Sequence, residues 1–208
     1  MSSIRLSGQW VCNGFARLIL PQTLLGVGDP SGDIVTKEMD YDQFAVYGFQ
    51  VGYPSTWRVE LNPKSEHAKG DVAFKAQDGT RMFVSWGLID SIQKKFATLD
   101  DQVKASVQRI KKDGQIGGIQ VLDQKEFQVC GHRAVYTRIS ATVRSTSLFS
   151  KSVGQRELWA AHLRCEKSGR YFVVYGSSQT DRTLEETTEV YNHLQGSFKC
   201  PCTCSNPP

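Results

Sequence analysis

Four successive stretches of strand-forming sequence between residues 118 and 178 constrain the fold of this chain most. Strands are expected near 118–129, 132–146, 155–165 and 170–178, with short connections between them. Short connections join antiparallel neighbours, because a parallel pair needs a long crossover. Apolar residues on both faces of the third stretch indicate a sheet that is covered, at least in part, on both sides. The sequence therefore predicts an antiparallel meander at the centre of the fold.

Further strands and two helices are expected around this meander. The earlier strands are predicted at 49–53, 57–61, 72–74 and 81–88. Asp78 and Gly79 join the last two, and Asp-Gly between alternating runs is a strong hairpin signal. Helices are predicted over 99–112 and 183–195, since their apolar residues recur at helical spacing. The residues expected to pack on the sheet are Val103, Val107, Ile110, Leu184, Tyr191 and Leu194.

Composition indicates an ordinary globular protein. Of the 208 residues, 39% are hydrophobic and 22% are charged, and the net charge is +4. This charge is too small to indicate a nucleic-acid partner, because dedicated binders concentrate positive charge on one face. No stretch is long and apolar enough to span a bilayer. The most apolar early stretch, 15–27, is interrupted and does not resemble a signal peptide, so we expect a cytoplasmic location without a membrane partner.

The chain divides into three expected parts. Residues 1–40 form an N-terminal leader with a possible strand at 15–20, and residues 41–199 form one α/β domain. Residues 200–208 form a proline-rich, cysteine-bearing tail that we expect to be flexible. No nucleophile elbow, zinc-protease motif or phosphate loop is present. We therefore expect no enzyme activity, no catalytic residue and no organic cofactor.

The cysteines form the one unusual pattern. Thiolates at alternate positions of the tail can converge on a soft metal such as Zn²⁺ or Cu⁺. In a meander, the first and third connections lie at the same end of the sheet, and the last helix leads the tail back toward that end. The candidate metal ligands are therefore Cys130, His132, Cys165, Cys200, Cys202 and Cys204. A disulfide between some of them, or a buried Cys165 beside a tail with incidental cysteines, remains an open alternative.

The segment from Tyr47 to Trp57 resembles the opening motif of the PsbP-like superfamily, an aromatic strand followed by Tyr-Pro, a small residue and Trp. The order of elements over 41–199 is also similar. The resemblance implies an α/β/α sandwich with a central, mostly antiparallel sheet. It also implies action through protein partners, since characterised members work mainly in that way. A fold alone does not determine an activity.

Three functions stay open at this point. The first is a non-enzymatic interaction or scaffold domain with a protein partner whose identity the sequence does not reveal. The second is a thiol or soft-metal protein that uses the cysteine cluster. The third is a small-molecule enzyme or carrier with a pocket between sheet and helix, which convergent polar groups in such a pocket would favour.

Overall fold

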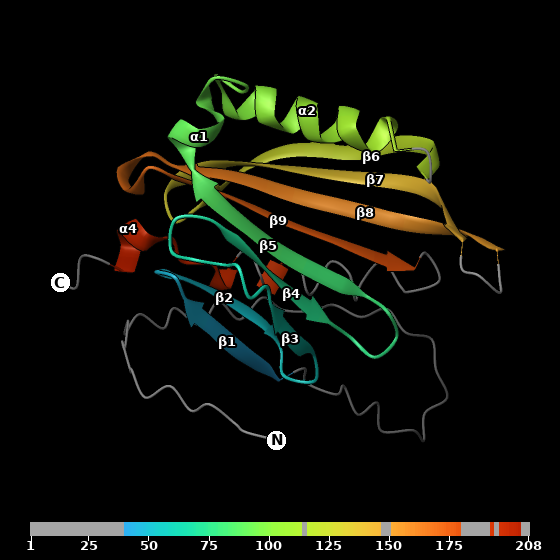
Figure 1. The fold of residues 1–208 in the computed structure, drawn as a ribbon, viewed down its shortest axis with the longest axis horizontal. Helices are drawn as coiled ribbons and strands as arrows, with labels where there is room; N and C mark the ends of the chain where they lie inside the picture. Colours follow the sequence, from blue (N-terminus) through green and yellow to red (C-terminus); the bar gives the residue numbers. More distant parts are fainter. Residues whose placement is uncertain (1–39, 114–115, 147–150, 180–191, 194–195, 205–208) are drawn as a thin grey trace, which may run out of the picture. The chain divides into compact units, whose positions relative to one another are not determined.

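A seven-stranded antiparallel sheet dominates the structure (Figure 1), with the strand order β3-β4-β5-β9-β8-β7-β6. The computed structural model describes residues 40–113, 116–146, 151–179, 192–193 and 196–204. The strands of the large sheet are β3 (Arg58–Leu61), β4 (Gly70–Lys75), β5 (Arg81–Leu88), β6 (Ile116–Val129), β7 (His132–Thr146), β8 (Lys151–Cys165) and β9 (Arg170–Gln179). The predicted meander is confirmed, because β6 to β9 are successive antiparallel neighbours.

Two tight turns set the register of the sheet. Between β4 and β5, Gly79 has a φ of +89° and the carboxylate of Asp78 accepts a hydrogen bond from the Thr80 amide at 2.8 Å. Between β6 and β7, Cys130 and Gly131 both have positive φ, at 52° and 74°. Positive φ at both central residues is the geometry of a two-residue hairpin turn whose twist matches that of the strands.

Two helices, α1 (Ile89–Gln93) and α2 (Leu99–Lys111), cover one face of the sheet (Figure 1). Leu99 and Val103 are buried in a cluster with Val135 of β7. Farther along α2, Val107 and Ile110 are only half-buried and line a cavity, which differs from the close packing expected for them.

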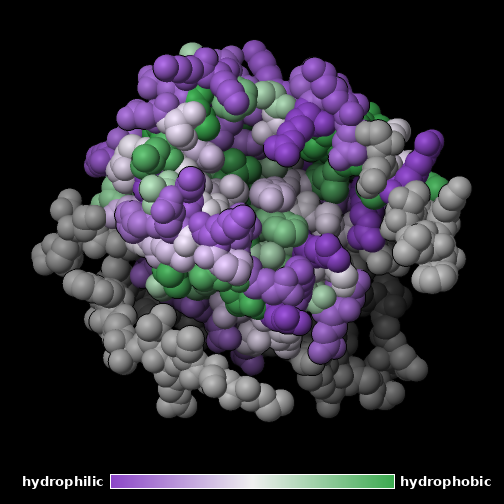
Figure 2. All heavy atoms as spheres, viewed as in Figure 1, coloured by the Kyte–Doolittle hydropathy of each residue, from purple (hydrophilic) through white to green (hydrophobic). Residues whose placement is uncertain are grey.

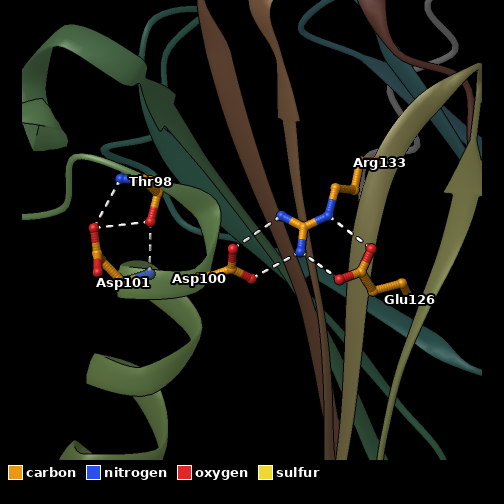
Figure 3. Close-up of polar contacts among 5 residues, drawn as sticks. All are labelled: Thr98, Asp100, Asp101, Glu126 and Arg133. Carbon is orange, nitrogen blue, oxygen red and sulfur yellow. Dashed lines mark hydrogen bonds and ion pairs between the residues drawn. The ribbon is translucent and has the colours of Figure 1, made fainter.

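Polar contacts fasten the N-terminus of α2 (Figure 3). The Thr98 hydroxyl accepts a hydrogen bond from the Asp101 amide at 3.1 Å, and the Asp101 carboxylate accepts one from the Thr98 amide at 3.0 Å. This capping box satisfies amides that have no partner within the helix. Arg133 of β7 reaches both Asp100 of α2 and Glu126 of β6, at 2.9 and 2.8 Å. Helix and sheet edge are thereby linked at the surface.

The opposite face of the sheet carries the hairpin of β1 (Tyr41–Val46) and β2 (Phe49–Pro54). The ring of Phe49 lies 5.1 Å from that of Trp86 and 5.4 Å from that of Phe172, so aromatic packing holds the hairpin against the sheet. Gln50 exchanges two backbone hydrogen bonds of 2.9 Å with Lys199, which adds the C-terminal segment to this layer. The leader before residue 40 and most of the predicted helix 183–195, with Leu184, Tyr191 and Leu194, lie outside the described residues. A complete α/β/α sandwich therefore stays an expectation.

Candidate metal centre

Four metal-ligating side chains meet at one end of the large sheet. The imidazole of His132 and the thiols of Cys165, Cys200 and Cys202 place their ligand atoms within 4.8 Å of one another. His132 Nε2 lies 3.0 Å from Cys202 Sγ, and the sulfurs of Cys200 and Cys202 are 2.9 Å apart. No disulfide joins these three cysteines.

The meander positions the first two ligands. His132 is the first residue of β7 and Cys165 is the last residue of β8. The antiparallel register pairs Ala134 with Leu163, so continuing it by two residues places His132 opposite Cys165. Residues opposite each other across an antiparallel pair point to the same face of the sheet. Both side chains therefore project toward the face that also carries Phe172 and the β1–β2 hairpin.

A hydrophobic anchor positions the other two ligands. Phe198 is buried, and its ring lies 5.3 Å from that of Phe172. The chain then continues through the backbone pairing of Lys199 to a fully buried Cys200. The short helix α4 (Pro201–Cys204) follows, lies against the 3-10 turn η1 (Glu166–Ser168), and presents Cys202 to the cluster. The burial of the Phe198 ring thus places the thiols of Cys200 and Cys202 near the start of β7 and the end of β8.

One of the six predicted ligands, Cys130, lies outside this group, and for a second, Cys204, the structure does not describe the side chain. The Cys130 thiol donates a hydrogen bond to the Phe198 carbonyl at 3.0 Å and accepts one from the Cys200 amide at 3.4 Å. Cys130 therefore positions the C-terminal backbone and is not one of the four grouped ligands. Cys204 ends α4, and its side chain is outside the described part of the chain. The start of the tail is packed against the domain, because Cys200 is fully buried.

The donor set matches the preferences of zinc. Structural zinc sites hold the ion between four cysteine or histidine ligands in a tetrahedron, and a Zn–S distance of about 2.3 Å separates sulfurs by about 3.8 Å. The observed atoms all lie within 4.8 Å, so small side-chain rotations suffice to surround an ion. Four protein ligands fill the tetrahedron and leave no position for a reacting water.

A buried arginine, Arg170, lies beside the cluster. Arg170 pairs with Cys165 across β8 and β9 and is only 2% exposed. Its Nη1 donates to the Tyr47 carbonyl at 2.6 Å, whereas Nε and Nη2 have no hydrogen-bond partner among the described residues. Burial lowers the pKa of Arg170, and the neighbouring Cys165 partly opposes this effect. Three thiolates around Zn²⁺ carry one net negative charge, which would compensate this guanidinium.

Sequence reasoning did not single out Arg170. The signal was available, because Arg170 follows Cys165 across a four-residue connection in the predicted hairpin. Burial, followed by hydrogen bonds to Cys200 and Cys165, raises the pKa of the Cys202 thiol to about 12. A metal ion that binds here must therefore displace protons.

The fold is similar to that of PsbP-like proteins of known structure, as the sequence motif predicted. The structure resembles the solution structure of cyanobacterial PsbP (CyanoP) from Synechocystis sp. PCC 6803, with a TM-score of 0.54 and 16% identity, over 85% of this chain and 98% of that one. It also resembles the crystal structure of the Saccharomyces cerevisiae Ran-binding protein Mog1p, with a TM-score of 0.53 and 8% identity, over 80% and 98% of the two chains. No family model and no curated protein sequence matches the chain. At these identities the likeness establishes the fold alone.

Proposed function

We propose that this protein is a non-enzymatic domain that binds one structural Zn²⁺ ion through His132, Cys165, Cys200 and Cys202. The observation that carries the proposal is the approach of all four ligand atoms to within 4.8 Å of one another. These residues come from two strand ends and the C-terminal segment, which are far apart in the sequence. Such an arrangement is that of a cross-link, because one ion would join the C-terminal segment to the paired ends of β7 and β8.

Zinc fits this donor set better than the alternative soft ion, Cu⁺. Both ions accept thiolate ligands, but four cysteine or histidine ligands in a closed tetrahedron are typical of structural zinc. The ion would supply a rigid connection between the strand ends and α4, while Arg170 balances its charge. The closed donor set also agrees with the expectation that the protein is not an enzyme.

Metal content of the full chain, purified without an affinity tag, tests the proposal. We expect about one zinc per chain by elemental mass spectrometry, since four ligands complete one tetrahedral site. The ligand variants Cys165→Ser and Cys202→Ser should lose the ion. Cys130→Ser is the matched control: it removes a neighbouring thiol outside the grouped ligands and keeps a hydrogen-bonding group, so it should retain zinc. Copper in place of zinc would contradict the choice of ion, and equal loss in all three variants would contradict the ligand set.

A role in protein interaction is the second part of the proposal. Strand β6 is an edge strand of the large sheet, and its Val121 and Leu122 side chains are 43% and 42% exposed. Unpaired backbone groups and exposed apolar side chains on an edge strand suit a partner that adds a strand. On the face seen in Figure 2, by contrast, hydrophobic residues are intermingled with hydrophilic ones. One similar structure bears the name of a Ran-binding protein, which supports the class of role but not a particular partner.

Recovery of partners from native extract tests this second part. Wild type should retain a protein that the Val121→Asp variant loses, because a charge at the edge opposes strand addition. The Val153→Asp variant is the control, since Val153 is also exposed but belongs to β8 inside the sheet. Identical sets of bound proteins for wild type and Val121→Asp would contradict a role for this edge. No helix among the described residues is long and apolar enough to cross a membrane. A cytoplasmic location stays a prediction.

A further inference from the structure

A cavity of about 490 Å³ lies between the C-terminal half of α2 and the large sheet. It occupies the face of the sheet that α2 covers, whereas the candidate metal centre belongs to the other face. The volume is within the range of small-molecule sites, which are concave, mostly apolar and equipped with a few polar groups. The cavity is therefore large enough for a ligand and independent of the metal.

Both small and bulky side chains of the sheet line this space. Ser85, Ala160 and Ser177 line it from β5, β8 and β9, while Val107 and Ile110 of α2 line it from above. Leu99 and Val103 are buried at the other end of the helix, but Val107 and Ile110 remain half-buried. An apolar space left empty forfeits dispersion contacts, so an occupant would recover stability there.

Polar groups without partners also line the cavity. His162 is 1% exposed; its Nε2 lies 2.9 Å from the Ser106 hydroxyl, but its Nδ1 has no hydrogen-bond partner among the described residues. The hydroxyl of Thr137, at 2% exposure, is likewise without one. Buried polar groups are nearly always hydrogen-bonded, so two exceptions in one cavity point to a missing partner. Burial lowers the pKa of His162 to about 4, which keeps the imidazole neutral at pH 7.

The charge of the lining favours an anion. Arg109 of α2 is exposed and contributes to the wall, and no aspartate or glutamate is among the described lining residues. No carboxylate in the described part of the chain forms an ion pair with Arg109. A guanidinium binds carboxylates with two parallel hydrogen bonds, which makes it a natural partner for an acidic head group.

We propose that this cavity binds a small apolar carboxylic acid that carries a second hydrogen-bonding group. Its carboxylate pairs with Arg109, and its hydrocarbon body lies against the apolar wall formed by Ile139, Leu158 and Val173. Its second polar group takes up the hydrogen-bonding capacity of His162 and Thr137. The protein would act as a carrier or sensor of such acids, because binding alone needs none of the catalytic groups that the sequence lacks.

Calorimetric titration of the full chain with ω-hydroxydecanoate tests this inference, with decanediol and decanoate as matched analogues. We expect one saturable site for the hydroxy acid and about tenfold weaker binding of the diol, which lacks only the carboxylate. Decanoate, which lacks only the hydroxyl, should also bind more weakly. Arg109→Gln should weaken hydroxy-acid binding to the level of the diol and leave diol binding unchanged. Lys104→Gln, at an exposed position of the same helix, is the control and should change neither affinity.

Two variants fill the cavity from opposite sides. Ala160→Leu adds volume from the sheet and Ile110→Trp adds it from the helix, and each should abolish binding. A melting temperature no lower than that of wild type shows that a variant is folded. The larger side chain of Ile110→Trp should be tolerated, because Ile110 is only half-buried. Absence of saturable binding to wild type would overturn the proposal. So would undiminished binding to a folded cavity-filling variant. Equal affinities for the hydroxy acid and the diol would overturn the assignment of a carboxylate ligand.

Discussion

His132 Nε2 lies 3.0 Å from Cys202 Sγ, although the two residues are 70 positions apart. In the proposed centre, one ion joins them, so removing the ion releases α4 from the start of β7. We expect a strong chelator to lower the melting temperature of wild type by about 4–8 °C, which corresponds to about 2 kcal/mol for a chain of this size. His132→Ala should already melt at the lower temperature and should respond little to the chelator. Equal melting temperatures of wild type with and without chelator would contradict a structural ion.

Trp57 follows the Tyr53-Pro54 turn and is 9% exposed. Truncation of a buried aromatic side chain removes its packing and leaves a cavity. We expect Trp57→Ala to reduce the free energy of unfolding by about 3–5 kcal/mol, measured by urea denaturation. Val153→Ala, at a position that is 67% exposed, should change it by less than about 0.5 kcal/mol. Similar midpoints for both variants would show that the Trp57 ring contributes little packing.

The capping box of Thr98 and Asp101 stabilises the start of α2. Thr98→Ala removes the acceptor of the Asp101 amide, and such a loss typically costs about 1 kcal/mol. Thr98→Ser keeps the hydroxyl and should restore most of the stability in the same denaturation experiment. If the serine variant is as unstable as the alanine variant, the cap is not the source of the effect.

His162 should make stability depend on pH. Burial lowers its folded-state pKa from 6.5 to about 4, so the unfolded chain takes up a proton more readily than the folded protein. Stability should therefore fall as the pH drops from about 7 to 4, by about 3 kcal/mol from this residue, and level off below the folded pKa. Urea denaturation of His162→Gln in the presence of chelator should show a shallower dependence. His67→Gln, at an exposed position, should keep the wild-type slope.

The sequence was most informative where one local rule dominates. Alternating apolar residues and short connections identify β6 to β9, because the side-chain period of a strand is two. The β1–β2 hairpin was harder to predict, since its turn places Tyr47 at a φ of 58°, a conformation that no tyrosine pattern signals. A pocket between sheet and helix was kept open as an alternative, but its place under Val107 and Ile110 was not predicted. Periodicity shows which face of a helix is apolar, but it does not show whether the sheet beneath carries side chains large enough to meet it.

The gathering of cysteines could be anticipated from topology, but the composition of the group could not. Strand order places the Cys130 turn, His132 and Cys165 at one end of the sheet. It does not distinguish which of these side chains point toward a common centre. The Cys130 thiol donates a hydrogen bond of 3.0 Å to the Phe198 carbonyl and is not one of the four grouped residues. That distinction depends on the side-chain direction at a residue with positive φ, which sequence spacing does not reveal.

X-ray absorption at the zinc edge of the full chain tests the central claim most directly. The account predicts three sulfur neighbours at about 2.3 Å and one nitrogen neighbour at about 2.0–2.1 Å. Cys165→Ser should remove or replace one sulfur neighbour, whereas Cys130→Ser should leave the spectrum unchanged. A protein that contains no zinc, or zinc surrounded only by oxygen and nitrogen, would contradict the proposed centre of His132, Cys165, Cys200 and Cys202.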